Sequence, residues 1–127
     1  MTRNINGAGI ILRDSGRRIL LVLGREHGKW SFPKGMLDND NPKTCAVREM
    51  KEETGLDVVI DNDCPYWICN DYIFYYLQAK DVVGSWRLHP ADVEEIEVAT
   101  WMSMDEILEI PDVACNNVLR NFKRKRK

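Results

Sequence analysis

Three glutamates lie close together in the segment "REMKEETGL", residues 48–56. At about 100° per residue, a helix would gather Glu49, Glu52 and Glu53 in one sector roughly 100° wide. Like charges at these spacings destabilise a helix by about 0.2–0.5 kcal/mol per pair. Two interpretations are open: a solvated face that Arg48 and Lys51 partly neutralise, or a site for a hard divalent cation, which prefers carboxylate oxygens.

The residues around these acids predict the helix that carries them. Asn41 can cap its start, and Pro42 suits its first turn, where a missing N–H is harmless. Gly55 can adopt the left-handed conformation that ends a helix after Thr54. The apolar face, which would pack on a sheet while the acids stay accessible, consists of Ala46, Val47 and Met50.

The remaining elements follow from apolar runs and turn signals. Runs rich in aliphatic, β-branched and aromatic residues predict strands at 7–12, 18–23, 57–60, 72–79 and 95–102. The first two flank the turn "RDSGR" and so predict a hairpin. Ser103 and Glu106 have capping-box spacing, which predicts a helix ending before Pro111. A last helix, capped by Asp112, is expected to run into the C-terminus, and this order predicts an α/β fold with a mixed β-sheet.

Composition limits the class of protein. The 127 residues suit one domain, and 44% apolar with 30% charged residues argues against disorder. No apolar run reaches the length of a membrane helix, and the N-terminus "MTRNINGAG" lacks a secretory signal. We therefore expect an intracellular, cytoplasmic protein that does not bind membranes. The four cysteines are scattered in a way that does not suit zinc, so any metal chemistry must use oxygen ligands.

Charge is unevenly distributed although the net charge is only −2. The last five residues, "KRKRK", hold 5 of the 18 basic residues. We divide the chain into a domain at 1–122 and a basic tail at 123–127. The tail is either a solvated terminus or an arm for nucleic acid or nuclear import, which leaves a nuclear location open. The residues that would contact RNA are Lys123, Arg124, Lys125, Arg126 and Lys127.

The segment from Lys29 to Leu56 resembles the Nudix box, G-x5-E-x7-R-E-U-x-E-E-x-G-U with U aliphatic. Its second half is filled by Arg48, Glu49, Met50, Glu52, Glu53, Gly55 and Leu56. The first half departs from the pattern, because Gly35 lies 13 residues before Arg48 where the family has 14. Either Asp40 or Asn41 takes the place of the family's first Glu. We prefer Asp40, which keeps the charge and the x7 spacing.

The resemblance implies a Nudix-like α/β/α sandwich and a metal-dependent hydrolase that uses Mg2+ or Mn2+. By position, the implied metal ligands are the Gly35 carbonyl, Glu49, Glu52 and Glu53. Glu49 and Glu53 would also take part in catalysis, and Arg48 would hold the glutamates in place.

The implied chemistry also needs a general base. The segment "VEEIEVATWMSMDEI" resembles the "EIxxxxW" segment of mRNA-decapping enzymes, which implies Glu95 as general base or extra ligand. Glu94 and Glu97 are rivals, and strand alternation makes Glu94 the weakest.

The stretches "WSFPKG" and "CAVREMKEETG" look most like the catalytic domain of mRNA-decapping enzymes. The implied reaction is attack of water on phosphorus in a pyrophosphate linkage of an RNA 5′ end, capped or triphosphorylated, or of a nucleoside polyphosphate. Lys34 is expected to meet substrate phosphate, and Trp30 or Trp67 to stack on a base. Two alternatives stay open: a hydrolase of dinucleoside polyphosphates or damaged nucleotides, and a catalytically silent Nudix module used for binding.

Overall fold

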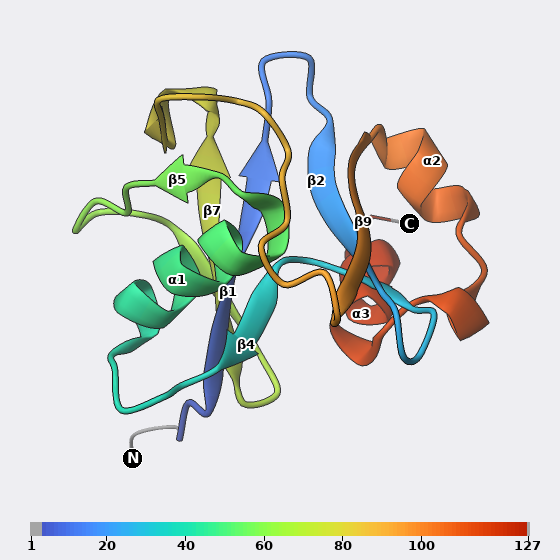
Figure 1. Cartoon of the computed structure of the whole chain (residues 1–127). Helices are drawn as coiled ribbons and strands as arrows, with labels where there is room; N and C mark the ends of the chain where they lie inside the picture. Colours follow the sequence, from blue (N-terminus) through green and yellow to red (C-terminus); the bar gives the residue numbers. More distant parts are fainter. Residues whose placement is uncertain (1–3, 127) are drawn as a thin grey trace.

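The computed structural model describes residues 4–126 and contains a mixed β-sheet between two helical layers (Figure 1). At its centre, β1 (Gly7–Arg13) and β7 (Tyr72–Gln78) run parallel. On one side β6 (Tyr66–Cys69) pairs antiparallel with β7. On the other, β2 (Ile19–Gly24) pairs antiparallel with β1, and β9 (Ile96–Met102) with β2. The predicted mixed sheet and its opening hairpin are thus confirmed.

The β1–β2 hairpin opens into a gap that positions the site. The two strands pair where Arg13 lies opposite Ile19, next to the turn. Farther from the turn, β3 (Trp30–Ser31) takes the free edge of β2 and β4 (Lys34–Met36) that of β1. The segment that joins these two short strands therefore lies inside the fold. Figure 1 shows β4 passing in front of β1.

Helices cover both faces of the sheet. The long helix α1 (Pro42–Thr54) lies on one face, and α2 (Met104–Glu109) and α3 (Asn117–Lys125) lie on the other (Figure 1). Outside these layers, β5 (Asp57–Val58) pairs with β8 (Val82–Val83) in a two-stranded ribbon. Two short 3-10 helices lie at Ala79–Asp81 and Asp112–Ala114. Within residues 4–126, no helix has the length and apolar character required to cross a bilayer.

The core consists of two clusters separated by the sheet. Along β1, Ile10 and Leu12 belong to the cluster beneath α1, whereas Ile11 belongs to the cluster beneath α3. This alternation is what a strand buried on both faces requires. Met50 of α1 and Phe122 of α3 are both fully buried. The arrangement is the predicted α/β/α sandwich.

The ends of α1 agree with the sequence prediction. The Asn41 side chain accepts a hydrogen bond from the Thr44 N–H at 2.9 Å, and Gly55 has the left-handed φ of 85°. The prediction for the last helix was wrong at its start. Asp112 begins a 3-10 turn, and α3 starts at Asn117 with Asn116 as its cap.

The extended backbone at Cys115 causes this break, because it bridges to Trp30 of β3. At its other end α3 continues to Lys125, so the predicted boundary between residues 122 and 123 falls inside a helix.

Candidate active site

The active-site candidate lies where α1 crosses β4. Gly35 is the middle residue of β4, and a Cβ atom at this position would overlap the Glu49 carboxylate. The absence of a side chain at Gly35 therefore lets the Glu49 carboxylate approach the strand closely. This contact brings Gly35, the first residue of the predicted motif, against the helix that carries the glutamates.

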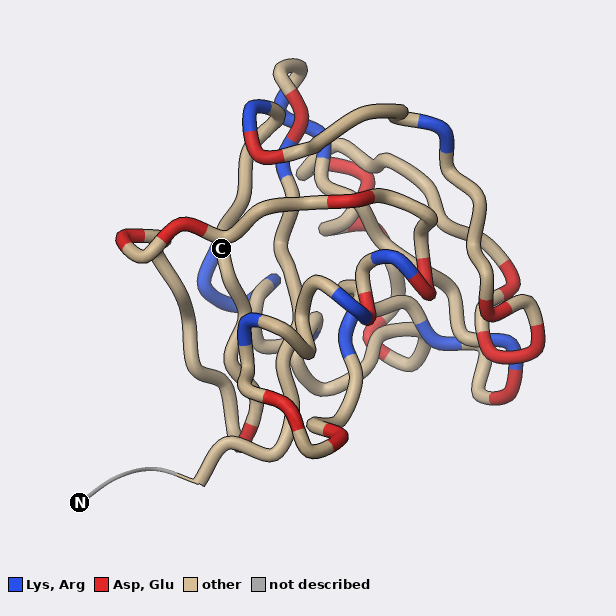
Figure 2. Tube along the Cα trace, turned by 60° about the vertical axis from the view of Figure 1, so that its left-hand side comes forward, with Lys and Arg blue, Asp and Glu red and all other residues tan. Residues whose placement is uncertain are grey.

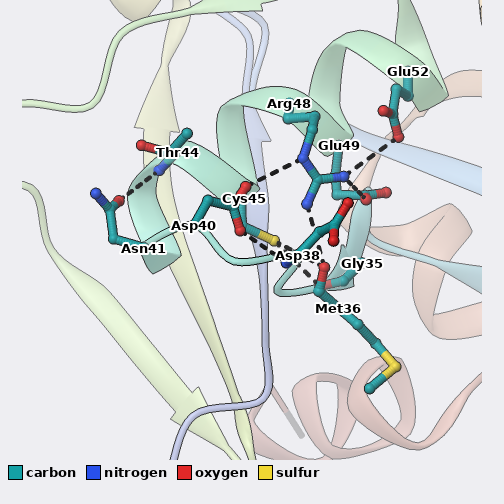
Figure 3. A network of polar contacts seen from close by, with 10 residues as sticks. All are labelled: Gly35, Met36, Asp38, Asp40, Asn41, Thr44, Cys45, Arg48, Glu49 and Glu52. Atoms are coloured by element: carbon teal, nitrogen blue, oxygen red, sulfur yellow. Dashed lines mark hydrogen bonds and ion pairs between the residues drawn. The ribbon is translucent and has the colours of Figure 1, made fainter.

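Arg48 organises the acidic residues (Figure 3). Its Nη1 donates to Glu49 Oε2 at 2.6 Å and lies 3.7 Å from Glu52 Oε2. Its Nε donates to Asp40 Oδ2 at 3.2 Å, and its Nη2 donates to the Met36 carbonyl at 3.3 Å. One guanidinium thus ties two glutamates of α1 to the loop that leads into the helix, in charge-assisted bonds.

The same network separates the two candidates for the family's first glutamate. Asn41 is occupied as the N-cap of α1. Asp40 binds Arg48 through one oxygen and accepts the Asp38 N–H at 2.9 Å through the other. The Asp38 N–H, together with the Arg48 guanidinium, lowers the pKa of Asp40. Asp40 therefore supports the loop and the arginine, as the preferred interpretation requires.

Glu53 is the most enclosed of the three glutamates. Its side chain accepts the Lys34 N–H at 3.1 Å, and the residue is only 4% exposed. Burial, with smaller contributions from the charges of Glu49 and Glu95, raises the pKa of Glu53 to about 8. The expectation that all three acids stay accessible was wrong, because β4 covers this face of α1; Glu52 alone among them remains partly exposed.

Glu95 reaches the cluster through the loop before β9. Three backbone bonds attach this loop to the end of α1: His89 N–H donates to the Thr54 carbonyl at 2.8 Å, and the N–H groups of Ala91 and Asp92 donate to the Glu52 carbonyl at 2.9 Å. Partial burial, the neighbouring Asp92 and the charge of Glu52 raise the pKa of Glu95. Asp92, which the sequence analysis missed, is therefore part of the acidic neighbourhood.

The alternation argument used to rank the rivals of Glu95 does not apply. Glu95 lies in a turn, and β9 starts at Ile96 with an irregular register against Gly24. Glu97 faces Arg25 instead, at 3.8 Å between Nη1 and Oε1. Glu94 is exposed. Of the three acids, Glu95 is the one whose charge raises the pKa of both Glu49 and Glu53.

The residues predicted to bind substrate occupy different places. Lys34 lies at the site, because its charge acts on both Glu53 and Glu95. Trp30 and Trp67 instead pack against the core cluster beneath α3, on the sheet face opposite α1.

The basic C-terminus is largely engaged with the protein itself. Lys123 is 4% exposed; its Nζ lies 3.0 Å from Asp112 Oδ1 and also donates to the Ile110 carbonyl. The predicted RNA contact by Lys123 is therefore wrong for this conformation, because its ammonium is buried. Lys125 Nζ lies 4.3 Å from the Trp67 ring centroid, and the Arg126 guanidinium lies 4.5 Å from that of Phe122.

Basic and acidic residues are mixed along the rest of the described chain. Figure 2 shows Lys and Arg interspersed with Asp and Glu along most of the chain. Arg124 donates to Asn121 at 3.3 Å. Lys127, the last residue assigned to RNA contact, lies outside the described residues.

The oxygen donors around Gly35 suit a hard divalent cation in kind. Within residues 4–126, no three His, Cys, Asp or Glu side chains form a ready-made metal site. The reason is that Glu49 is turned toward Arg48 and Glu53 toward the Lys34 N–H. The donors are carboxylates plus a backbone carbonyl, the ligands that Mg2+ and Mn2+ prefer, and Gly35 leaves the position beside the Glu49 carboxylate free of a side chain. These residues fit such an ion once the carboxylates turn toward it.

Known proteins resemble this chain in sequence and in fold. Residues 3–120 match the model of the NUDIX domain. The chain is 31% identical over 112 residues to mRNA-decapping enzyme subunit 2 of Saccharomyces cerevisiae. The aligned region covers 81% of this chain but only 11% of that protein. The chain is also 31% identical over 75 residues to the RNA pyrophosphohydrolase of Bartonella henselae, covering 55% of this chain and 40% of the relative.

A solved MutT NUDIX hydrolase from Burkholderia pseudomallei superposes over all of both chains with a TM-score of 0.69 at 20% identity, which shows a shared fold. The chain thus spans only 11% and 40% of the lengths of the two sequence relatives, but the family match covers nearly all of its own length. The chain belongs to the NUDIX domain family.

Proposed function

We propose that the protein is a divalent-metal-dependent hydrolase that cleaves a pyrophosphate linkage in an RNA 5′ end or a nucleoside polyphosphate. The observation that carries the proposal is the approach of Glu49 and Glu53, both buried, to the Gly35–Lys34 segment of β4. Burying two acidic groups side by side is costly, and of the two Arg48 pairs with Glu49 alone, so a further cation would offset the remaining cost. Binding of a metal ion would account for the stability that the fold loses by burying Glu49 and Glu53.

The residues that would hold the ion are the Gly35 carbonyl, Glu49, Glu52, Glu53 and Glu95. Bound Mg2+ or Mn2+ would supply neutralisation of the phosphate charge and activation of a water molecule. The intact set of carboxylates argues against the silent binding module, which would have no use for them.

The protein's own side chains would position the carboxylates and the phosphates and would deprotonate the attacking water. Arg48 keeps Glu49 and Glu52 beside β4 through the contacts described above, from where both carboxylates can turn toward an ion. The positive charge of Lys34 acts on both Glu53 and Glu95, and its side chain can meet the phosphates. Glu95, whose pKa is raised, is suited to accept a proton from the attacking water.

An RNA 5′ end is the substrate that we favour. Two of the relatives reported above are named for the decapping of mRNA and for RNA pyrophosphohydrolysis. Arg124, Lys125 and Arg126 lie at the end of α3 and can contribute phosphate contacts that do not depend on sequence. Lys125 and Arg126 would have to leave their present aromatic partners to do so.

The test is parallel hydrolysis of capped RNA, 5′-triphosphorylated RNA, diadenosine tetraphosphate and nucleoside triphosphates, with Mg2+ and with Mn2+. Glu52→Gln and Glu53→Gln are the disabling variants, and Glu94→Gln is the matched control on an exposed acid. We expect preference for an RNA end, lost in both variants but not in the control. Preference for free nucleotides would make the protein a nucleotide hydrolase, and absence of metal-dependent turnover on every substrate would contradict the proposal.

A further inference from the structure

The strand β4 presents different groups on its two faces. Gly35 faces α1 and Glu49, so Lys34 and Met36, its neighbours on the strand, face the opposite side. Met36 is 67% exposed, and in Figure 3 its side chain points away from Arg48. An exposed, flexible apolar side chain is thus the direct neighbour of the expected metal-binding carbonyl.

An aromatic ring lies beside this strand, across Gly7 of β1. Gly7 is paired with Tyr72 on one edge and with Met36 on the other. A Cβ atom at Gly7 would overlap the Tyr72 ring and would come within 2.7 Å of the Gly35 carbonyl oxygen. The missing side chain therefore allows the Tyr72 ring to lie next to the metal-site strand.

The Tyr72 ring packs against a neighbouring ring and interacts electrostatically with residues of the candidate site. It stacks on Phe74 with centroids 6.1 Å apart and planes at 21°, and it is half-buried. Lys34 Nζ lies 5.5 Å from its centroid. The pKa of Tyr72 is raised first by burial and further by nearby acids that include Glu49 and Glu53. Lys34 thus lies over the aromatic ring, and its charge also acts on Glu53 and Glu95.

We propose that Tyr72 and Met36 form the surface that receives a nucleobase of the substrate, with its phosphates passing Lys34 toward the carboxylates. The direction of the phosphates rests on the function proposed above. A supported aromatic ring accepts any base by stacking, and a methionine adapts its shape to different bases. We assign this surface the role predicted for Trp30 and Trp67, which pack against the core cluster beneath α3.

The test compares a ligand that has a base with one that has none. Binding of ATP and of inorganic tripolyphosphate is measured by calorimetry with Ca2+ at 4 °C, and chromatography checks for products. Tyr72→Leu is expected to weaken ATP binding roughly 5- to 100-fold while tripolyphosphate affinity stays within about twofold. Tyr72→Phe, which keeps the ring, should bind ATP like the wild type. Met36→Ala, at an exposed position that does not endanger folding, should weaken ATP binding about two- to tenfold.

The proposal is overturned if Tyr72→Leu weakens both ligands equally or neither, or if the wild-type protein does not prefer ATP to tripolyphosphate. Circular dichroism of each variant separates lost folding from lost stacking. Because the readout is binding, base-selective binding without hydrolysis of any substrate would refute the hydrolase function and retain the base site. Hydrolysis of a substrate, combined with equal effects of Tyr72→Leu on ATP and tripolyphosphate binding, would retain the hydrolase function and refute the base site.

Discussion

Replacing Glu53 by Gln is expected to stabilise the metal-free protein at neutral pH. Burial raises the pKa of Glu53 from 4.5 to about 8, so the folded state holds this proton more tightly than the unfolded state. The free energy of unfolding is therefore highest below pH 4.5 and decreases as pH rises toward 8. At 1.36 kcal/mol per pH unit, keeping Glu53 protonated in the folded state while it ionises in the unfolded state costs about 1 kcal/mol at pH 5 and about 3 kcal/mol at pH 7.

Gln removes this cost without removing the local hydrogen bond, since its amide oxygen can still accept the Lys34 N–H. The assay is urea unfolding of wild type and Glu53→Gln in EDTA at pH 5 and pH 7. Glu94→Gln, on an exposed side chain, is the control and should match the wild type. A variant that is no more stable than the wild type at pH 7, or whose advantage does not grow from pH 5 to pH 7, would refute the reasoning.

Three further predictions concern the base, the glycine and the buried lysine. Glu95→Gln should lower kcat by roughly 10²-fold and remove the acidic limb of the pH–rate profile, measured by initial rates. Gly35→Ala should displace the Glu49 carboxylate and weaken Mn2+ binding on the order of tenfold or more, measured by calorimetry. Lys123→Ala should destabilise the fold by about 1–3 kcal/mol in urea unfolding, because it removes the ammonium that donates to the Ile110 carbonyl and pairs with Asp112.

Local chemistry accounts for the parts of the fold that the sequence predicted well. The bounds of α1 depend on a side-chain cap at Asn41 and a left-handed glycine at Gly55, and both act within a few residues. The long strands could be recognised from their own composition. The start of α3 could not, since Asp112 and Asn116 are both acceptable caps and a distant pairing of Cys115 with Trp30 favours the second.

The candidate site was predictable in its residues but less so in its environment. The spacing of the glutamates in the motif identified the acids, whereas their burial depends on β4, a strand too short to show a pattern. The neighbourhood of Tyr72 was also hidden, because it requires the pairing of β1 with both β4 and β7. Within "YIFYYL", no local signal separates Tyr72 from the core aromatic residues.

The most direct test of a metal-dependent hydrolase is to titrate Mn2+ while following bound metal and hydrolysis of 5′-triphosphorylated RNA in the same samples. The account predicts that turnover rises in proportion to bound metal in the wild type. Both signals should be lost in Glu53→Gln, although that variant is folded and more stable without metal. Full turnover in EDTA, or unchanged metal binding and turnover in Glu53→Gln, would contradict it.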